Sequence, residues 1–178
     1  MIPPMNHVID YAHSQYKSDW IDVFLWAKCR FFIGANSGPV LLPNIFGVPS
    51  IMTNCFPLFS RTWSNDLFIP KKNIVFTGQN RFLSFRENLS SPIVYIFKEV
   101  SINAMGYVLV DNSPKELDEI VTEMIEILDN KLSCSTFDNY LQNQFDDLEV
   151  NIDYTGQKVQ GNSRIGNKFI HRYQNLLS

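Results

Sequence analysis

The sequence predicts an α/β fold, a doubly wound parallel sheet with flanking helices, from the order of apolar and polar runs in its N-terminal third. A short β-rich run at His7–Tyr11 precedes a segment of helical length, Ser18–Cys29. Arg30–Ala35 is a continuous apolar run between polar residues, which is typical of a strand buried on both faces of a parallel sheet. A short helical segment, Val40–Phe46, then leads to another strand-like run at Ser50–Thr53. Strand, helix, strand, helix, strand in this order indicates a doubly wound half-domain.

The two helices of this unit carry residues that are typical of helix ends. Ser18 is placed to cap the first helix, whose apolar side chains surround most of its circumference, so we expect it to be covered on two sides. Pro39 suits the first position of the second helix, and Gly47 suits the position after its last residue. Pro43 lies inside that helix, which we therefore expect to be short or kinked.

The remainder of the chain predicts further helices around the same sheet. No period persists over Cys55–Gln79, which we interpret as a long loop over the sheet edge. Ser113 begins a capping sequence before an apolar stripe, so a helix is expected at Pro114–Asp129. The other expected elements are a short capped helix at Ser84–Glu87, a strand at Tyr107–Val110, and helices at Phe137–Leu148 and Arg164–Leu177. We divide the chain into a domain over residues 1–149, a polar loop over 150–162, and a segment over 163–178 whose helix packs back on the domain.

Composition restricts the expected function classes. The 178 residues are 45% hydrophobic and 19% charged, values of a globular rather than a disordered chain. The 15 Lys and Arg against 18 Asp and Glu give a net charge of -3, so nucleic acid is not an expected partner. The longest apolar stretch, Val23–Ala35, is interrupted by Lys28 and Arg30, so no membrane span is expected.

Cysteine and histidine spacing predicts neither a metal site nor a disulfide framework. Cys29, Cys55 and Cys134 lie far apart, and the histidines form no pair four residues apart. We therefore expect no bound metal and no cofactor. The expected location is the cytoplasm, with peripheral association at the inner membrane as the alternative.

The turn after Arg30–Ala35 has residues suited to ligand chemistry. In an open α/β sheet, ligands bind outside the carboxyl ends of the strands, where a helix N-terminus offers N–H groups to a phosphate. Gly38 would let the backbone approach a diphosphate, Ser37 adds a hydroxyl donor, and Asn36 can orient a ribose or phosphate oxygen. Asn54, at the end of the next strand, could contact the base or the sugar. An ordinary strand-to-helix turn uses the same residue types, so spacing alone leaves both interpretations open.

Three common catalytic motifs are missing from the sequence. Gly34 and Gly38 are separated by three residues, so the dinucleotide-binding fingerprint is absent, and there is no P-loop. Ser37 does not lie in a G-x-S-x-G turn. Nucleotide-dependent redox chemistry, P-loop phosphoryl transfer and serine hydrolysis are therefore disfavoured.

Several segments resemble one known family. In chain order, these are the V-I-D-Y run with Ser14 after it, CRFFIGANSG, FGVPSIMTN, GYVLVDNSPKELDEIVTEMIEIL and RIGNKFIHRYQNLL. Together they resemble the C-terminal half of bacterial GT-B-type glycosyltransferases that are encoded with surface-polysaccharide genes. More distantly, Asn36, Ser37 and Gly38 are similar to the Asp-Ser/Thr-Gly turn that binds the donor diphosphate in heptosyltransferases, with Asn in place of Asp.

The resemblance implies a Rossmann-like domain that forms half of a GT-B architecture. In that architecture the C-terminal half holds a nucleotide-diphosphate sugar, and an N-terminal acceptor-domain partner completes the cleft. It implies a glycosyltransferase that transfers the sugar to a saccharide acceptor, and it assigns no catalytic base in this half. The alternative is a catalytically silent nucleotide-binding or truncated remnant domain that needs a partner half. An apolar docking surface is expected around Trp20, Phe59, Trp63 and Phe68.

Four further residues are candidates for donor binding. Tyr11 and Ser14 follow the first predicted strand and would face the cleft, although an ordinary loop role also fits them. Arg61 and Lys71, with Lys72 beside them, lie in the predicted loop and could clamp a diphosphate in place of a metal ion. Solvated loop charges are the alternative interpretation of these cations.

Overall fold

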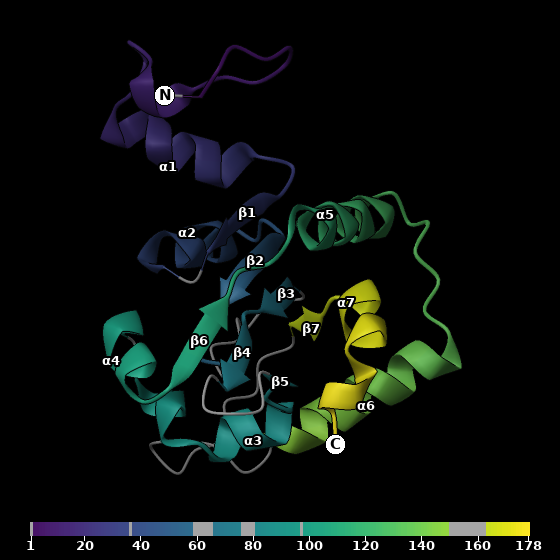
Figure 1. The fold of residues 1–178 in the computed structure, drawn as a ribbon. Coiled ribbons are helices and arrows are strands. Elements are labelled where there is room, and N and C mark those ends of the chain that lie inside the picture. The colour runs from purple at the N-terminus through teal and green to yellow at the C-terminus, as the bar shows by residue number, and fades with distance from the viewer. Residues whose placement is uncertain (1, 36, 59–65, 76–80, 97, 150–162) are drawn as a thin grey trace.

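The computed structural model of the chain describes residues 2–35, 37–58, 66–75, 81–96, 98–149 and 163–178 (Figure 1). This part of the chain contains one parallel and one antiparallel sheet with helices around them. The strands are β1 (Phe32–Ala35), β2 (Ser50–Cys55), β3 (Leu67–Pro70), β4 (Lys72–Val75), β5 (Arg81–Phe82), β6 (Tyr107–Val110) and β7 (Arg164–Ile165). The α-helices are α1 (Asp19–Lys28), α2 (Leu41–Ile45), α3 (Phe85–Ser90), α4 (Glu99–Ala104), α5 (Pro114–Leu128), α6 (Thr136–Glu149) and α7 (Asn167–Arg172). Short 3₁₀ turns lie at Tyr11–His13, Gly38–Val40, Pro92–Tyr95 and Gln174–Leu176.

The parallel sheet has the strand order β1-β2-β3-β7. Ile51 of β2 lies opposite Ile33 of β1 on one side and Leu67 of β3 on the other. All of β3 is buried, and so is every residue of β2 except Asn54, as expected for central strands of a parallel sheet. These strands confirm the α/β class with a Rossmann-like parallel sheet, and both apolar runs of the N-terminal third form strands where predicted.

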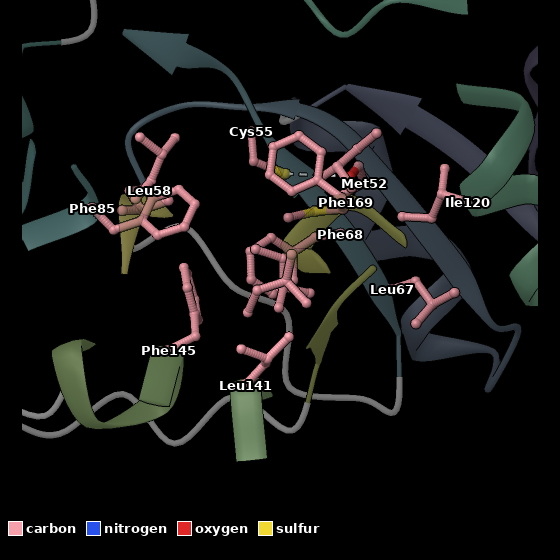
Figure 2. Packing of buried hydrophobic residues seen from close by; sticks show 14 of the residues in the cluster. Met52, Cys55, Leu58, Leu67, Phe68, Phe85, Ile120, Leu141, Phe145 and Phe169 are labelled. Carbon is pink, nitrogen blue, oxygen red and sulfur yellow. Dashed lines mark hydrogen bonds between the residues drawn. The ribbon is translucent and has the colours of Figure 1, made fainter. Parts of the chain in front are cut away.

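Helices cover both faces of this sheet. On one face α5 packs against β2 and β3, and a Cβ on Gly166 would lie 3.2 Å from the side chains of Ile120 (α5) and Ile69 (β3). Neighbouring residues of a strand point to opposite faces, so Phe68 faces the other side. There its ring packs on that of Phe145 in α6, with a centroid distance of 5.8 Å (Figure 2). The core therefore has two layers, one on each side of the sheet.

The predicted helix ends are confirmed. The Gly38–Val40 turn and α2 together form a short helical segment, and Gly47 after it has a φ of 71°. α3 and α5 each begin with a capping box, formed by Ser84 with Glu87 and by Ser113 with Glu116. The apolar stripes predicted after residues 113 and 136 correspond to α5 and α6.

The second sheet occupies part of the segment predicted as a long loop. β4 pairs antiparallel with both neighbours in the order β5-β4-β6. Cys55–Gln79 therefore contains β3 and β4, and the loop prediction is wrong for these strands. β3 is four residues long, apolar throughout and ends in Pro70, so it shows no alternation from which a strand could be recognised. Residues 59–65 and 76–80 lie outside the described residues.

The first predicted strand does not form. His7–Tyr11 leads into a 3₁₀ turn, and β1 is the first strand of the parallel sheet in the described chain. α1 begins where predicted, with the Ser18 hydroxyl accepting a hydrogen bond from the Ile21 N–H at 3.3 Å, but none of its residues is buried. In Figure 1 this purple N-terminal segment and α1 lie at one end of the molecule. β propensity did not produce a strand here because no neighbouring strand pairs with the run.

Of the residues predicted to form an apolar docking surface, one is exposed and another is buried. Trp20 on α1 is exposed, as predicted. Phe68 is completely buried because it lies on β3 under α6. Phe59 and Trp63 lie outside the described residues.

The C-terminal segment is not the single helix predicted at Arg164–Leu177. Its first two residues form β7 beside β3, and α7 and a 3₁₀ turn follow Gly166. Ile165 is completely buried in the sheet, so tertiary pairing overrides the helical stripe. α7 packs against α5 and α6. The polar loop predicted at 150–162 lies outside the described residues.

Candidate functional site

The carboxyl ends of β1 and β2 lie side by side at one edge of the parallel sheet. Ala35, the last residue of β1, is opposite Thr53, so Ser37 follows the end of β1, and Asn54 lies one residue before the end of the neighbouring β2. Ser37 and Gly38 are exposed, and a Cβ on Gly38 would meet no atom within 4 Å. The fold thus brings three of the predicted donor-binding residues to one open edge.

The turn at this edge offers fewer backbone donors than the sequence predicts. Pro39 has no N–H, and the Val40 N–H donates to the Ser37 carbonyl at 3.1 Å. The Ser37 side chain does not cap the 3₁₀ turn, and α2 has only five residues, so its dipole is small. A phosphate bound here would rely on the N–H groups of Ser37 and Gly38 and on the Ser37 hydroxyl.

Asn54 is held in a left-handed backbone conformation by a reciprocal pair of hydrogen bonds. Its φ is 51°, its N–H donates to Asn112 Oδ1 at 2.6 Å, and its Oδ1 accepts from the Asn112 N–H at 2.7 Å. Asn112 Nδ2 also donates to the Pro70 carbonyl at 2.8 Å. These bonds join the ends of β2 and β3 to the start of α5. The Asn54 Nδ2 group takes no part in this pair.

The two lysines that follow β3 form different ion pairs. Lys71 Nζ lies 2.7 Å from Asp111 Oδ1, and Asp111 is exposed. Lys72 Nζ lies 2.8 and 2.7 Å from the two carboxylate oxygens of Glu116, and both side chains are buried. A diphosphate clamp by Lys72 is therefore wrong, because its charge is neutralised inside the core. Lys71 keeps an exposed partner that a competing anion can displace.

Glu116 connects this buried pair to the cap of α5 and to the C-terminal segment. Burial raises the pKa of this carboxyl, but hydrogen bonds from Lys72, the Ser113 backbone and Tyr173 outweigh burial and lower the pKa to about 2. Burial and then the Glu116 carboxylate raise the pKa of Tyr173 to about 12. The Lys72 ammonium lies 5.2 Å from the centre of the Tyr173 ring. The sequence identifies Glu116 only through its capping position, and no spacing rule links it to Lys72, 44 positions away.

Two further predicted site residues, Tyr11 and Ser14, make hydrogen bonds within the N-terminal segment and none, among the described contacts, to Ser37, Gly38 or Asn54. The Tyr11 hydroxyl donates to the Ser18 carbonyl and accepts from the Ser18 N–H, both at 3.0 Å. The Ser14 hydroxyl donates to the Tyr11 carbonyl at 2.9 Å. Because the first predicted strand does not form, no strand end presents these two residues to a cleft. Asn36 and Arg61 lie outside the described residues.

The described residues offer no cluster of metal-binding side chains and no membrane-spanning helix. In the described ranges, no group of three or more His, Cys, Asp or Glu side chains could hold a metal ion, and all three cysteines are free. None of the helices described here combines the length and apolar character that crossing a bilayer requires. Comparisons with protein-family models, curated proteins and solved structures find no match. The function is therefore inferred from the residues and their geometry.

Proposed function

We propose that this chain is the donor-binding half of a glycosyltransferase of bacterial surface-polysaccharide synthesis, which transfers a sugar from a nucleotide-diphosphate sugar to a saccharide acceptor. The observation that carries the proposal is the open Ser37–Gly38 turn beside Asn54, at the carboxyl edge of a parallel sheet. Ligands of open α/β sheets bind at that edge. The similarity of this turn to the diphosphate-binding turn of heptosyltransferases supports the same assignment.

In the proposed site the diphosphate lies over Gly38, where no side chain obstructs its approach. The N–H groups of Ser37 and Gly38 and the Ser37 hydroxyl donate to its oxygens, and Lys71 supplies a cation once Asp111 is displaced. Negative charge grows on the nucleoside diphosphate as the sugar leaves, so these fixed donors stabilise the transition state without a metal ion. The other proposed donor contacts are Asn54, Asn36 and Arg61; Tyr11 and Ser14 are not part of the proposed site, because their hydroxyls bond within the N-terminal segment.

A catalytically silent nucleotide-binding domain is the second candidate function. The pairing of Lys71 with Asp111 and the shortness of α2 weaken the anion site in both functions, so neither observation favours one function over the other. The two functions share the nucleotide site and differ only in turnover. A partner half is expected in both functions, and only in the first does it complete an active site.

Calorimetric titration of the chain with UDP, GDP, ADP and CMP tests the proposed site. We expect weak binding of at least one nucleotide, on the order of 0.1–1 mM, because only one side of the cleft is present. Asp111→Asn should tighten that binding a few-fold by releasing Lys71. Asp118→Asn, which removes an exposed carboxylate elsewhere on α5, is the matched control and should not change binding. Absence of heat with all four nucleotides would contradict the donor site.

A further inference from the structure

The N-terminal arm, residues 2–31, exposes an apolar surface that the other described residues do not cover. α1 is apolar around most of its circumference, yet none of its ten residues is buried. Trp20 is 76% exposed and Phe24, one turn later, is 51% exposed. A helix that is apolar on all sides is normally enclosed by protein or membrane. The exposed apolar surface of α1 is therefore of the kind that a binding partner normally covers.

The apolar surface continues onto α2, which contacts α1. Ile45 on α2 is 74% exposed, and Leu41 and Phe46 are also exposed. An aromatic side chain alone can bury about 150–250 Å². Exposed aromatic and aliphatic side chains of this size are typical of the buried core of an interface between protein chains.

The charges of α1 indicate which partner fits this surface. Asp19 and Asp22 lie in its first turn, and Lys28 lies in its last turn. The arm carries acidic and basic residues in equal number, so it has no excess positive charge to attract an anionic membrane or nucleic acid. Two α1 helices in antiparallel orientation would place the acidic end of each beside the basic end of the other. A parallel pair would place like charges together.

We infer that the surface formed by α1 and α2 binds a second copy of this chain, through antiparallel pairing of the two α1 helices about a two-fold axis. A two-fold interface uses the same patch on both copies, which the charge distribution of α1 permits. Trp20, Val23, Phe24 and Ala27 have the i, i+3, i+4, i+7 spacing of a contact stripe. The inference does not depend on the donor site.

Light scattering after size exclusion measures the expected dimer directly, at micromolar concentrations of the full chain. Wild type should have twice the monomer mass, and Trp20→Ser/Phe24→Ser should weaken association at least tenfold. Both side chains are exposed, so circular dichroism of this variant should match wild type. Val100→Ser is the matched control, because Val100 is an 80% exposed apolar residue on α4. A monomeric wild type, or a dimer that survives the double substitution, would overturn the inference.

Charge reversal distinguishes a second copy from any other partner. Asp19→Lys and Lys28→Glu should each weaken the homodimer by about tenfold, because each puts like charges together twice in a two-fold pair. Mixing the two variants should restore a dimer containing one copy of each, detected by native mass spectrometry. Failure of the mixture to form this heterodimer would overturn antiparallel pairing. Binding of a monomeric wild type to neutral phosphatidylcholine vesicles would overturn it in favour of a lipid surface.

Discussion

Lys72 and Glu116 have the least exposed side chains of any ion pair in the described residues, at 5% and 1%. Lys72 begins β4 of the antiparallel sheet, and Glu116 lies in the first turn of α5 on the parallel sheet. Desolvating two charges is costly unless their other polar atoms are also bonded. Hydrogen bonds from Ser113 and Tyr173 to Glu116 meet this condition. The pair therefore joins β4 of the antiparallel sheet to the helix that packs on the parallel sheet.

Removing one partner of this pair should destabilise the protein strongly. Lys72→Met leaves the Glu116 carboxylate buried without its cation, and we expect a loss of about 3–5 kcal/mol in the free energy of unfolding. Lys72→Met/Glu116→Gln should recover most of that loss, because Gln still completes the capping box with Ser113. Lys71→Met, which removes an ion pair whose Asp111 partner is exposed to solvent, should cost less than about 1 kcal/mol. Urea unfolding at pH 7 measures all three, and equal losses for the two single variants would contradict the expectation.

Glu116 should also make stability sensitive to acid. Its pKa of about 2 in the folded protein lies below its ordinary value of 4.5, so its contribution is complete above pH 4.5. That contribution is lost as pH falls from 4.5 towards 2. Urea unfolding at pH 5 and pH 3 should therefore show a smaller loss on acidification for Lys72→Met/Glu116→Gln than for wild type. An equal loss would contradict the pKa assignment.

Glu123 should have the opposite effect on stability. Burial raises the pKa of this carboxyl to about 7, although the Asn167 N–H donates to its Oε2 at 2.9 Å and Arg164 and Lys168 favour its charged form. Because the folded pKa is raised, the stabilising contribution is complete below pH 4.5 and is lost as pH rises through 7. Glu123→Gln should therefore match wild type at pH 5 and be more stable at pH 8, by on the order of 2–3 kcal/mol.

Denaturant unfolding at these two pH values checks the Glu123 expectation. Asp118→Asn on the same helix removes an exposed carboxylate and should follow the pH dependence of wild type. A Glu123→Gln variant that loses stability equally at pH 5 and pH 8 would show that the carboxyl is charged and needed in the fold.

The helical segment after β1 has one glycine at its start, Gly38, which belongs to the proposed ligand site, and one after its end, Gly47, which has a positive φ. A side chain at Gly38 would enter open space, so Gly38→Val should keep the far-ultraviolet circular dichroism and the melting temperature of wild type. It should weaken nucleotide binding at least tenfold, because the new side chain would stand where the diphosphate approaches. Gly47→Ala, at the other end of the same segment, should instead cost about 1 kcal/mol of stability because φ is 71° there. Loss of fold in Gly38→Val would support an ordinary turn.

α5 connects several parts of the molecule that are distant in sequence. It packs on β2 and β3, Asn112 before it bonds the end of β2, and its first turn holds the buried lysine of β4. Its capping box therefore stabilises the candidate site as well as the helix. The capping signal could be recognised from the sequence, because Ser113 and Glu116 interact within one helical turn. The partners of α5 could not, since they lie 44 and 58 positions away.

The whole molecule should bind a donor without completing sugar transfer. Transfer requires an acceptor and a base held within reach of the donor carbon, and a misplacement of about 1 Å can cost on the order of a hundredfold in rate. We expect no nucleoside diphosphate release from UDP-, GDP- or ADP-sugars with the 178-residue chain and saccharide acceptors. Release should appear when a second Rossmann-like polypeptide encoded beside this chain is added. Robust transfer by the chain alone would contradict the half-enzyme proposal, and binding without turnover in either case would favour the silent domain.

The sequence alone predicted the features that arise from interactions between near neighbours. Apolar runs predicted β1 and β2, stripes with a helical period predicted α5 and α6, and Ser18, Ser84 and Ser113 predicted helix starts. Each of these signals depends on residues up to four positions apart, so it survives without knowledge of the fold. The same short-range patterns placed Ser37 and Gly38 after a strand end.

Only the tertiary structure decided how distant segments meet. Leu67–Pro70 becomes a central strand and Arg164–Ile165 an outer strand because each finds a partner far along the chain. His7–Tyr11 finds none and forms no strand, although its residues favour one. Lys72 pairs with the buried Glu116 carboxylate of α5 and so cannot serve the candidate site. No residue of α1 is buried, although most of its side chains are apolar. Strand pairs and buried ion pairs join residues that are far apart in the sequence, so patterns within a few residues cannot predict them.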